Sequence, residues 1–275
     1  PGLNNTIRSG YYELRHNYGI KRVLGIQEGY KGLDPHEGLE PIELTAHFVD
    51  DINDMGGTVL RTSRGGRDPV DMADYLEAHD IDILFCIGGD GTQRGAHAIA
   101  EEMRVRGAAR SIVGIPKTID NDVPFVYQSF GYATALEEAT DVLRHAHVEA
   151  RCHHNGIGLV KLMGRDAGFI AAGAAVAAQE ANFVLVPEVP FPLEGDDGFL
   201  AALERRIEAR HHAVGVTAVG AGQHLFEAGA VSSDASGNRR YRDIGTFLKE
   251  RIKQHLAERG IETTVKYFDP SYSIR

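Results

Sequence analysis

The chain has 275 residues, 43% of them hydrophobic and 25% charged, a composition typical of globular proteins with a sizeable core. At roughly one domain per 150 residues, this length favours two lobes over one. The net charge of -10 argues against nucleic acid and anionic membranes as partners, and no apolar run approaches the ~20 residues that a membrane span needs.

Strands and helices are predicted to alternate through the first half of the chain. Apolar spacing and glycine punctuation indicate their positions, as where Gly56 and Gly57 close a helix. The expected order is helix 3–18, strand 21–27, helix 44–55, strand 58–62, helix 70–79, a strand ending at Gly88, helix 91–107 and strand 111–115.

The second half continues this alternation. Its expected elements are helix 131–150, strand 156–163, helix 168–179, strand 182–188, helix 199–210, strand 213–219, helix 244–259 and strand 262–268. Such a pattern predicts an α/β protein with parallel sheets covered on both faces. We expect two doubly wound, mostly parallel-sheet lobes, residues 1–131 and 132–275, with the active site in the cleft between them.

One stretch, IDILFCIGGDGTQRG at residues 81–95, carries the first chemical signal. An apolar strand runs into three glycines around Asp90, and glycine lets backbone N–H groups approach a polyanion closely. A helix follows, and a helix N-terminus favours anions. The aspartate beside such a phosphate site makes sense if it holds a divalent cation. An ordinary glycine-rich turn is the alternative.

A second motif, PKTIDND at residues 116–122, follows one strand and helix later. Asp120 and Asp122 with Lys117 and Thr118 suit a reaction in which a hydroxyl loses its proton while a phosphoryl group arrives. One aspartate would act as base, and the lysine would neutralise developing charge. An Asx-type turn after the proline explains the motif equally well on its own.

Several short motifs in a fixed order make a resemblance specific. They are Pro1-Gly2-Leu3-Asn4 with Ile7-Arg8, GGDGT, PKTIDND, Met163-Gly164-Arg165, Pro187-Glu188 and the terminal DPSYSIR. Together they resemble the phosphofructokinase family over nearly the whole chain, above all the branch of plant and trypanosomatid ATP-dependent 6-phosphofructokinases. NAD kinases and lipid kinases share GGDGT, but they are not expected to supply PKTIDND and MGR downstream.

The resemblance implies transfer of the γ-phosphoryl group of MgATP to the 1-hydroxyl of fructose 6-phosphate, which gives fructose 1,6-bisphosphate and ADP in glycolysis. Asp120 would be the general base, and Asp90 would serve the Mg2+. The catalytic set implied is Asp120, Thr118, Arg64 and Lys117. The nucleotide set is Arg64, Gly65, Gly89, Asp90, Gly91, Thr92, Gln93 and Gly95. The sugar-phosphate set is Thr118, Ile119, Asp120, Asp122, Met163, Gly164, Arg165, Lys266, Tyr272 and Arg275.

The phosphoryl donor can be argued from three residues. In this family a small residue after GGD leaves room for a nucleotide, and Gly91 and Gly95 are both small, which favours ATP. Lys117 points the other way, because pyrophosphate-dependent members have a lysine there, although the plant-like ATP-dependent branch shares it. Gly91 carries more weight, and pyrophosphate stays the alternative donor. Tyr30 resembles a family tyrosine near the nucleotide, or it packs as a loop aromatic.

Three departures from the family pattern leave a further alternative open. The family's glycine-rich loop is missing before Pro1, and both ends of the chain look cut. Val219 stands where the family has a glutamate on the sugar, and Arg61 stands where it usually has a glycine. A noncatalytic paralogue that only binds ligand would explain these changes.

The resemblance also predicts assembly, and the cysteines predict a compartment. Family members share sites between subunits, so we expect a homo-oligomer, either a dimer or a tetramer. Cys86 and Cys152 give no disulfide framework, which favours a cytoplasmic location.

Overall fold

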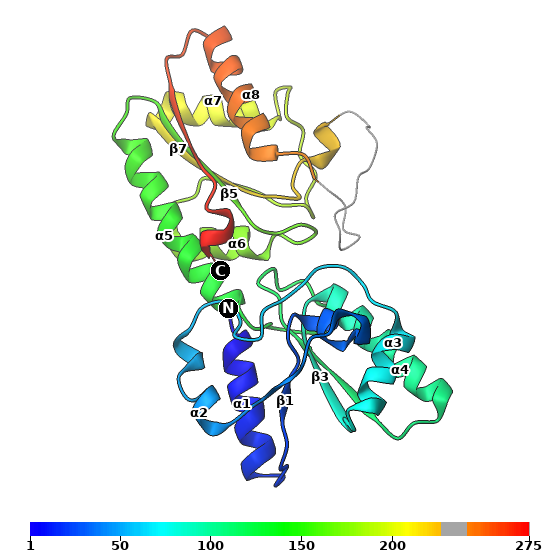
Figure 1. Cartoon of the computed structure of the whole chain (residues 1–275). Coiled ribbons are helices and arrows are strands. Elements are labelled where there is room, and N and C mark those ends of the chain that lie inside the picture. The colour runs from blue at the N-terminus through cyan, green and yellow to red at the C-terminus, as the bar shows by residue number, and fades with distance from the viewer. Residues whose placement is uncertain (227–240, 275) are drawn as a thin grey trace. The chain divides into compact units, whose positions relative to one another are not determined.

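The computed structural model describes residues 1–226 and 241–274, which fall into two compact units (Figure 1). The first unit is Pro1–Thr118, and the second is formed by the described residues from Ile119 on. This division lies ahead of the boundary predicted near Gly131, because Ile119 packs into the second unit's core beside Ala135. Within the described ranges, no helix combines the length and apolar character needed to cross a bilayer.

The first unit contains one antiparallel and one parallel strand pair. Its elements are α1 (Leu3–His16), β1 (Leu24–Gly25), β2 (Ile42–Glu43), α2 (Ala46–Val49), α3 (Pro69–Ala78), β3 (Ile83–Gly88), α4 (Asp90–Arg106) and β4 (Ser111–Pro116), with 3-10 turns η1 (Gly29–Leu33), η2 (Pro35–Glu37) and η3 (Ile52–Asp54). Strands β1 and β2 pair antiparallel. Strands β3 and β4 run parallel in register from Ile83 opposite Ser111 to Gly88 opposite Pro116, so their carboxyl ends lie together.

The β3–β4 pair is covered unequally on its two faces. Leu84 and Cys86 point into a core that α3 and α4 complete with residues such as Ile99. On the other face, Ile83 and Phe85 are 44% and 40% exposed. The alternation of buried and exposed residues along β3 is that of a strand with one face in a core.

Two predicted elements in this unit are wrong. The helix expected over 44–55 is two short pieces, α2 and η3, because the acidic residues between them favour local turns over a continuous helix. Residues 58–62, all described, form no strand. The backbone N–H of Val59 donates instead to Asn4 Oδ1 at 2.9 Å, and Arg61 has a left-handed φ of 63°. The left-handed φ of Arg61 interrupts an extended strand, and the Val59 N–H is not available to a neighbouring strand.

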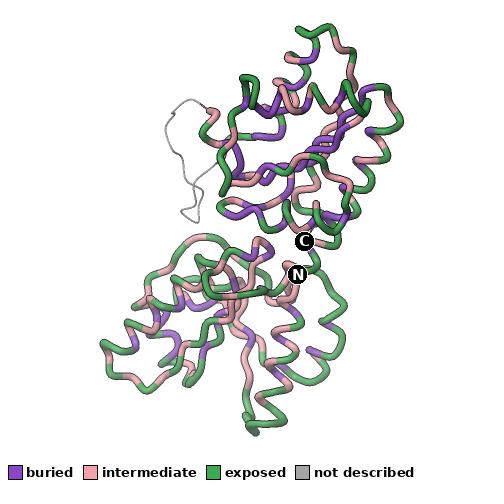
Figure 2. Tube along the Cα trace, turned by 180° about the vertical axis from the view of Figure 1, so that it is seen from behind, coloured by how far each residue is buried: buried purple, intermediate pink, exposed green. Residues whose placement is uncertain are grey.

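The second unit holds a four-stranded sheet in the order β6-β7-β5-β8, with all neighbours parallel. Its elements are α5 (Tyr132–Arg151), β5 (Gly156–Leu162), α6 (Phe169–Ala178), β6 (Phe183–Leu185), α7 (Phe199–Arg210), β7 (His212–Ala218), α8 (Ile244–Glu258) and β8 (Thr264–Phe268), with 3-10 turns η4 (Gln223–Leu225) and η5 (Ser271–Ile274). Figure 2 shows its central strands buried along nearly their whole length.

Helices cover both faces of this sheet and divide its core in two. Small residues of α5 and α6, such as Ala139 and Ala174, pack with Val160 and Val216 on one face. Larger side chains of α7 and α8 pack with Leu159 on the other face. The α/β class with parallel sheets, predicted from the alternating pattern, is confirmed.

Candidate active site

The GGDGT turn lies between the carboxyl end of β3 and the start of α4. A Cβ atom at Gly88 would lie 2.3 Å from Thr92 Oγ1, so the turn closes tightly only around glycine. The N–H groups of Thr92 and Gln93 both donate to the Gly89 carbonyl, at 2.9 and 3.0 Å. Gly91 is open by contrast, since the nearest atom to a Cβ there is Arg94 Nη2 at 3.9 Å.

The PKTIDND motif begins beside this turn. The Lys117 N–H donates to the Gly88 carbonyl at 2.9 Å, and a Cβ at Gly89 would lie 3.7 Å from Thr118 Cβ. Gln93 joins the two strands, because its Nε2 donates to Gly88 O at 2.9 Å and to Ile115 O at 3.2 Å. The structure thus brings the GGDGT turn and the first residues of PKTIDND together at one edge of the β3–β4 pair, where parallel sheets bind ligands.

Asp90 is the residue of this turn that could hold a metal ion. Its side chain is 70% exposed at the first position of α4 and forms an ion pair with Arg94 one turn later. Among the described residues, the one grouping of three potential ligands is Asp34, His36 and Asp71, which does not include Asp90. A single exposed carboxylate fits Mg2+, because this ion keeps several waters and shares its remaining positions with substrate phosphates.

Tyr30 contacts the GGDGT turn and the first turns of α4. Its hydroxyl donates to the Thr92 carbonyl at 2.5 Å, and its ring lies where a Cβ at Gly95 would meet Tyr30 Cε2 at 2.4 Å. Burial raises the pKa of the Tyr30 hydroxyl above its ordinary value, so the group stays a donor. Tyr30 therefore packs against α4, and Gly95 is small because this ring needs the space.

Two ion pairs of Arg67 hold the C-terminal end of the loop that carries Arg64 and Gly65. Arg67 Nη2 lies 3.0 Å from Glu37 Oε1, and Arg67 Nε lies 3.3 Å from Asp34 Oδ2. Gly65 takes a left-handed φ of 97°, which suits a turn of this kind. Arg64 itself is exposed, so its guanidinium is accessible from solvent.

The rest of PKTIDND belongs to the second unit. Ile119 is buried, Asp120 is half-buried and Asp122 is exposed. Asn121 has a left-handed φ of 55° and fixes the following loop, because its Oδ1 accepts from Ser129 N at 2.7 Å. Its Nδ2 donates to Tyr127 O at 3.1 Å. Asn121 is thus the turn-forming member of the motif.

Met163, Gly164 and Arg165 follow β5 at the carboxyl edge of the second unit's sheet. Gly164 has a φ of 126°, and its carbonyl accepts from Gly220 N at 2.9 Å. A Cβ at Gly220 would lie 1.5 Å from the Arg165 carbonyl oxygen, so the two loops touch through their backbones. Val219, half-buried, precedes this contact and places a valine side chain where the resemblance predicts a glutamate.

The last three predicted phosphate ligands are placed differently from one another. Tyr272 is 67% exposed on η5, just after β8. Lys266 lies within β8 opposite Gly158, and its Nζ is 2.9 Å from Glu149 Oε1 on α5. The structure therefore does not bring Lys266 to the edge that carries Met163, because four residues of β5 separate Gly158 from that position. Arg275 lies outside the described residues.

Comparison with known proteins settles the family. The family model described as phosphofructokinase matches residues 1–269. The chain belongs to the phosphofructokinase family. The resemblance drawn from the ordered motifs is thereby confirmed.

Individual relatives in this family are similar over the whole chain. The ATP-dependent 6-phosphofructokinase of Borreliella burgdorferi is 48% identical over 281 residues, which cover 100% of this chain and 63% of that protein. ATP-dependent 6-phosphofructokinase 7 of Arabidopsis thaliana is 46% identical, and the enzyme of Trypanosoma cruzi is 47% identical; each is covered over 56% of its length. This chain therefore spans a little over half the length of these phosphofructokinases.

Solved phosphofructokinases share the fold. Pichia pastoris phosphofructokinase in the T-state superposes with a TM-score of 0.76 at 21% identity, over 100% of this chain and 28% of that one. The pyrophosphate-dependent enzyme of Marinobacter aquaeolei has a TM-score of 0.76 at 23% identity, over 99% of this chain and 65% of that one. At 21–23% identity, the similarity to these two structures establishes a shared fold only.

Proposed function

We propose that the protein acts as an ATP-dependent 6-phosphofructokinase, transferring the γ-phosphoryl group of ATP to the 1-hydroxyl of fructose 6-phosphate. The observation that carries the proposal is the meeting of the GGDGT turn with Lys117 and Thr118 at the carboxyl ends of β3 and β4. A candidate phosphate-binding turn and the first residues of the candidate acid–base segment are thereby adjacent in one unit. Relatives 46–48% identical over the whole chain bear this activity in their names.

Several residues of the two motifs would have a role in such a transfer. Asp120 would take the proton from the attacking hydroxyl, and the Lys117 ammonium would neutralise charge on the phosphoryl group. The N–H groups of the glycine turn would bind the donor's phosphates. Asp90 would hold Mg2+, and the bound ion would offset the phosphates' negative charge. Chemistry of this type depends mostly on positioning and charge, which suits residues held by backbone contacts.

Space above Gly91 supports ATP as the donor. A side chain at that position would enter a region where the nearest atom, Arg94 Nη2, is 3.9 Å from the Cβ position. The open region is room for a nucleotide, whereas pyrophosphate would need less. Lys117 motivates the alternative donor, so rates with ATP and with pyrophosphate should be measured side by side. A preference for pyrophosphate would reverse this part of the proposal.

Replacing Asp120 by alanine tests the proposed reaction. Turnover in the complete protein should fall by at least about 1,000-fold, the scale of losing a base and its positioning. Asp141→Asn, an exposed aspartate on α5, is the matched control and should keep full turnover. Unchanged turnover in Asp120→Ala, measured by coupled detection of ADP, would end the assignment.

Val219 motivates a second candidate function, a paralogue that binds sugar phosphate without converting it. The valine lies at the loop contact beside Gly164, where it offers no acceptor to a sugar hydroxyl. An unpaired hydroxyl in a closed site costs about 1–3 kcal/mol. Calorimetric binding of fructose 6-phosphate without detectable product would favour this candidate, and restored turnover in Val219→Glu would identify the valine as the cause.

A further inference from the structure

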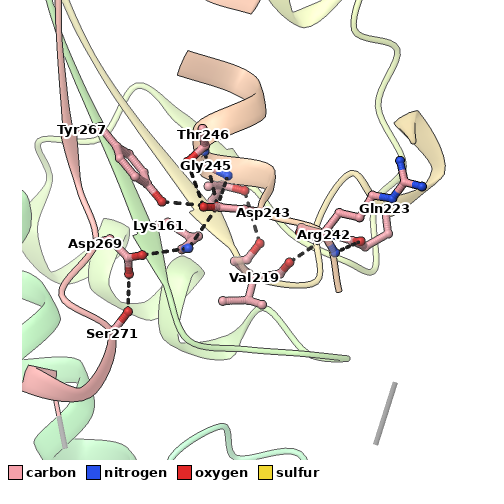
Figure 3. Close-up of polar contacts among 12 residues, drawn as sticks. Lys161, Val219, Gln223, Arg242, Asp243, Gly245, Thr246, Tyr267, Asp269 and Ser271 are labelled. Atoms are coloured by element: carbon pink, nitrogen blue, oxygen red, sulfur yellow. Dashed lines mark hydrogen bonds and ion pairs between the residues drawn. The ribbon is translucent and has the colours of Figure 1, made fainter. Parts of the chain in front are cut away.

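A cluster of charged side chains lies at the carboxyl edge of the second unit's sheet, apart from the predicted site residues. Lys161, the next-to-last residue of β5, places Nζ 3.0 Å from Asp243 Oδ1 and 2.8 Å from Asp269 Oδ2. Figure 3 shows the ammonium between these two carboxylates. The Lys161 side chain is only 13% exposed, so solvent and salt screen the two ion pairs less than they screen surface pairs.

The lysine stays charged in this position. Burial alone would lower the pKa of Lys161, but its hydrogen bonds to Asp269 and Asp243 outweigh burial and raise the pKa above its ordinary value. The Tyr267 ring, centred 5.9 Å from the ammonium, adds a favourable contact with its π face. One permanent positive charge therefore binds two carboxylates that come from different parts of the chain.

Each carboxylate fixes a different segment. Asp243 caps α8, because its Oδ1 accepts from Gly245 N at 3.1 Å and from Thr246 N at 3.3 Å. Asp269 directly follows β8 and accepts from Ser271 Oγ at 2.5 Å, at the start of η5. Since both carboxylates bind one ammonium, the start of α8 and the chain after β8 are tied to β5.

The loop after β7 joins the same network through Gln223. The Arg242 N–H donates to Gln223 Oε1 at 3.1 Å, and Gln223 Nε2 donates back to Arg242 O at 3.1 Å. The same Nε2 also donates to Val219 O at 3.2 Å. Arg242 directly precedes Asp243, which is paired with Lys161. Gln223 therefore links the position of Val219 to that of Asp243.

The segments tied together in this way carry predicted substrate contacts. Met163 follows Lys161 by two residues on the same chain segment, Tyr272 lies on η5, and Val219 borders the loop of Gly164. Backbone hydrogen bonds join the loops after β5 and β7, from Val219 N to Leu162 O at 3.0 Å and from Gly220 N to Gly164 O at 2.9 Å. The side-chain network of Lys161 adds the start of α8 and the chain after β8. A ligand that spans them binds tightly only if they are ordered before it arrives.

We infer that Lys161 is a positioning residue for the sugar-phosphate substrate, holding the loops after β5, β7 and β8 in their binding arrangement through Asp243 and Asp269. The inference rests on the proposed function and deepens it. Lys161 need not touch the reacting atoms, so its contribution lies in substrate binding, while the chemical step depends on the β3–β4 edge and Asp120.

Kinetics of Lys161→Met in the complete protein test the inference. The KM for fructose 6-phosphate should rise about tenfold, while kcat stays within about threefold and the KM for ATP within about twofold. Lys161→Arg should restore most of the loss, because a guanidinium keeps the charge and can bond both carboxylates. Lys253→Met is the matched control, since it makes the same change at an exposed position of α8.

Asp269→Asn keeps the inference testable if Lys161→Met does not fold. This variant loses one ion pair and retains the contact of Lys161 with Asp243, so the KM for fructose 6-phosphate should rise by a smaller factor. Wild-type KM values in the folded variants, or equal losses for both substrates, would overturn the inference and leave the proposed function standing. A wild-type protein that neither binds nor converts fructose 6-phosphate would overturn the proposed function, and the inference with it.

Discussion

The two sheet edges that carry candidate site residues are held together by different forces. At the β3–β4 edge, the main-chain hydrogen bond from Lys117 N to Gly88 O joins the GGDGT turn to the start of PKTIDND, and a contact with Thr92 that admits only glycine at position 88 shapes the turn. At the β5 edge, defined here as the loops after β5, β7 and β8, the buried charge of Lys161 connects them. The first edge is joined by main-chain hydrogen bonds, whereas the second combines a close backbone contact, between Gly220 and Arg165, with the buried ion pairs of Lys161.

This difference predicts which kind of substitution disrupts each edge. A main-chain contact between closely packed atoms cannot adjust, so one added methyl group displaces the whole turn. An ion pair responds to protonation, and removing one partner leaves the other charge buried without compensation. Shape changes should therefore damage either edge, whereas charge or pH changes should damage the β5 edge more than the β3–β4 edge.

Of the predictions that compare the two edges, the largest effect is expected from Gly88→Ala, which adds one methyl group to the β3–β4 edge and changes no charge. The new Cβ would lie 2.3 Å from Thr92 Oγ1 and 2.7 Å from Thr92 Cβ, so the turn must move. A displacement of about 1 Å costs roughly 100-fold in rate, and we expect kcat/KM for ATP to fall by that factor. Gly56→Ala, where nothing lies within 4 Å, should be neutral. Equal rates in both variants would contradict the comparison.

A smaller effect is expected from Gln93→Leu, which removes the one side chain identified above as bridging the β3 and β4 ends. Loss of its donor leaves the carbonyls of Gly88 and Ile115 with one hydrogen bond fewer each. The free energy of unfolding should fall by about 1–2 kcal/mol, measured by urea denaturation. Gln254→Leu on α8, whose amide hydrogen bonds to Arg251 and Glu258 stay within the same helix, should change it less. Equal losses would show that the Gln93 contact adds nothing.

The smallest effect is the pH dependence that Asp243 contributes at the β5 edge. Burial opposes ionisation of Asp243, but hydrogen bonds from Thr246 and Lys161 outweigh it and hold the pKa of Asp243 below its ordinary value. The unfolded chain therefore binds more protons just below about pH 4, the ordinary aspartate range, and stability falls as the pH falls through this window. Denaturation of the wild type and Asp243→Asn should show their difference shrinking from about pH 7 to about pH 3. A constant difference would argue that the Asp243 charge is irrelevant.

Sequence patterns predicted the β3–β4 edge well, because an edge built from the main chain leaves local marks. Glycines accumulate where atoms come close, so the strand ending at Gly88 and the helix after it were expected where β3 and α4 lie. The strand expected over 111–115 is β4, Ser111–Pro116, and the phosphofructokinase resemblance followed from the same short motifs.

Sequence patterns could not predict the β5 edge, because its contacts join residues far apart in the chain. Lys161 and Asp243 are separated by 82 positions, and nothing near either residue indicates the other. The missing strand at 58–62 has the same cause, since Asn4, 55 positions away, accepts the N–H that a neighbouring strand would need. Contacts of this kind become visible only once the chain is folded.

The fit between Tyr30 and Gly95 has a consequence for how such a protein can change over generations. A Cβ at Gly95 would meet the Tyr30 ring at 2.4 Å, and the same ring reaches the Thr92 carbonyl through its hydroxyl. A larger residue at position 95 therefore requires a smaller residue at position 30. That change would also remove the hydroxyl that bonds the Thr92 carbonyl. Positions 30 and 95 should therefore change together during evolution. A mutational library that varies only one of them should yield mostly destabilised variants.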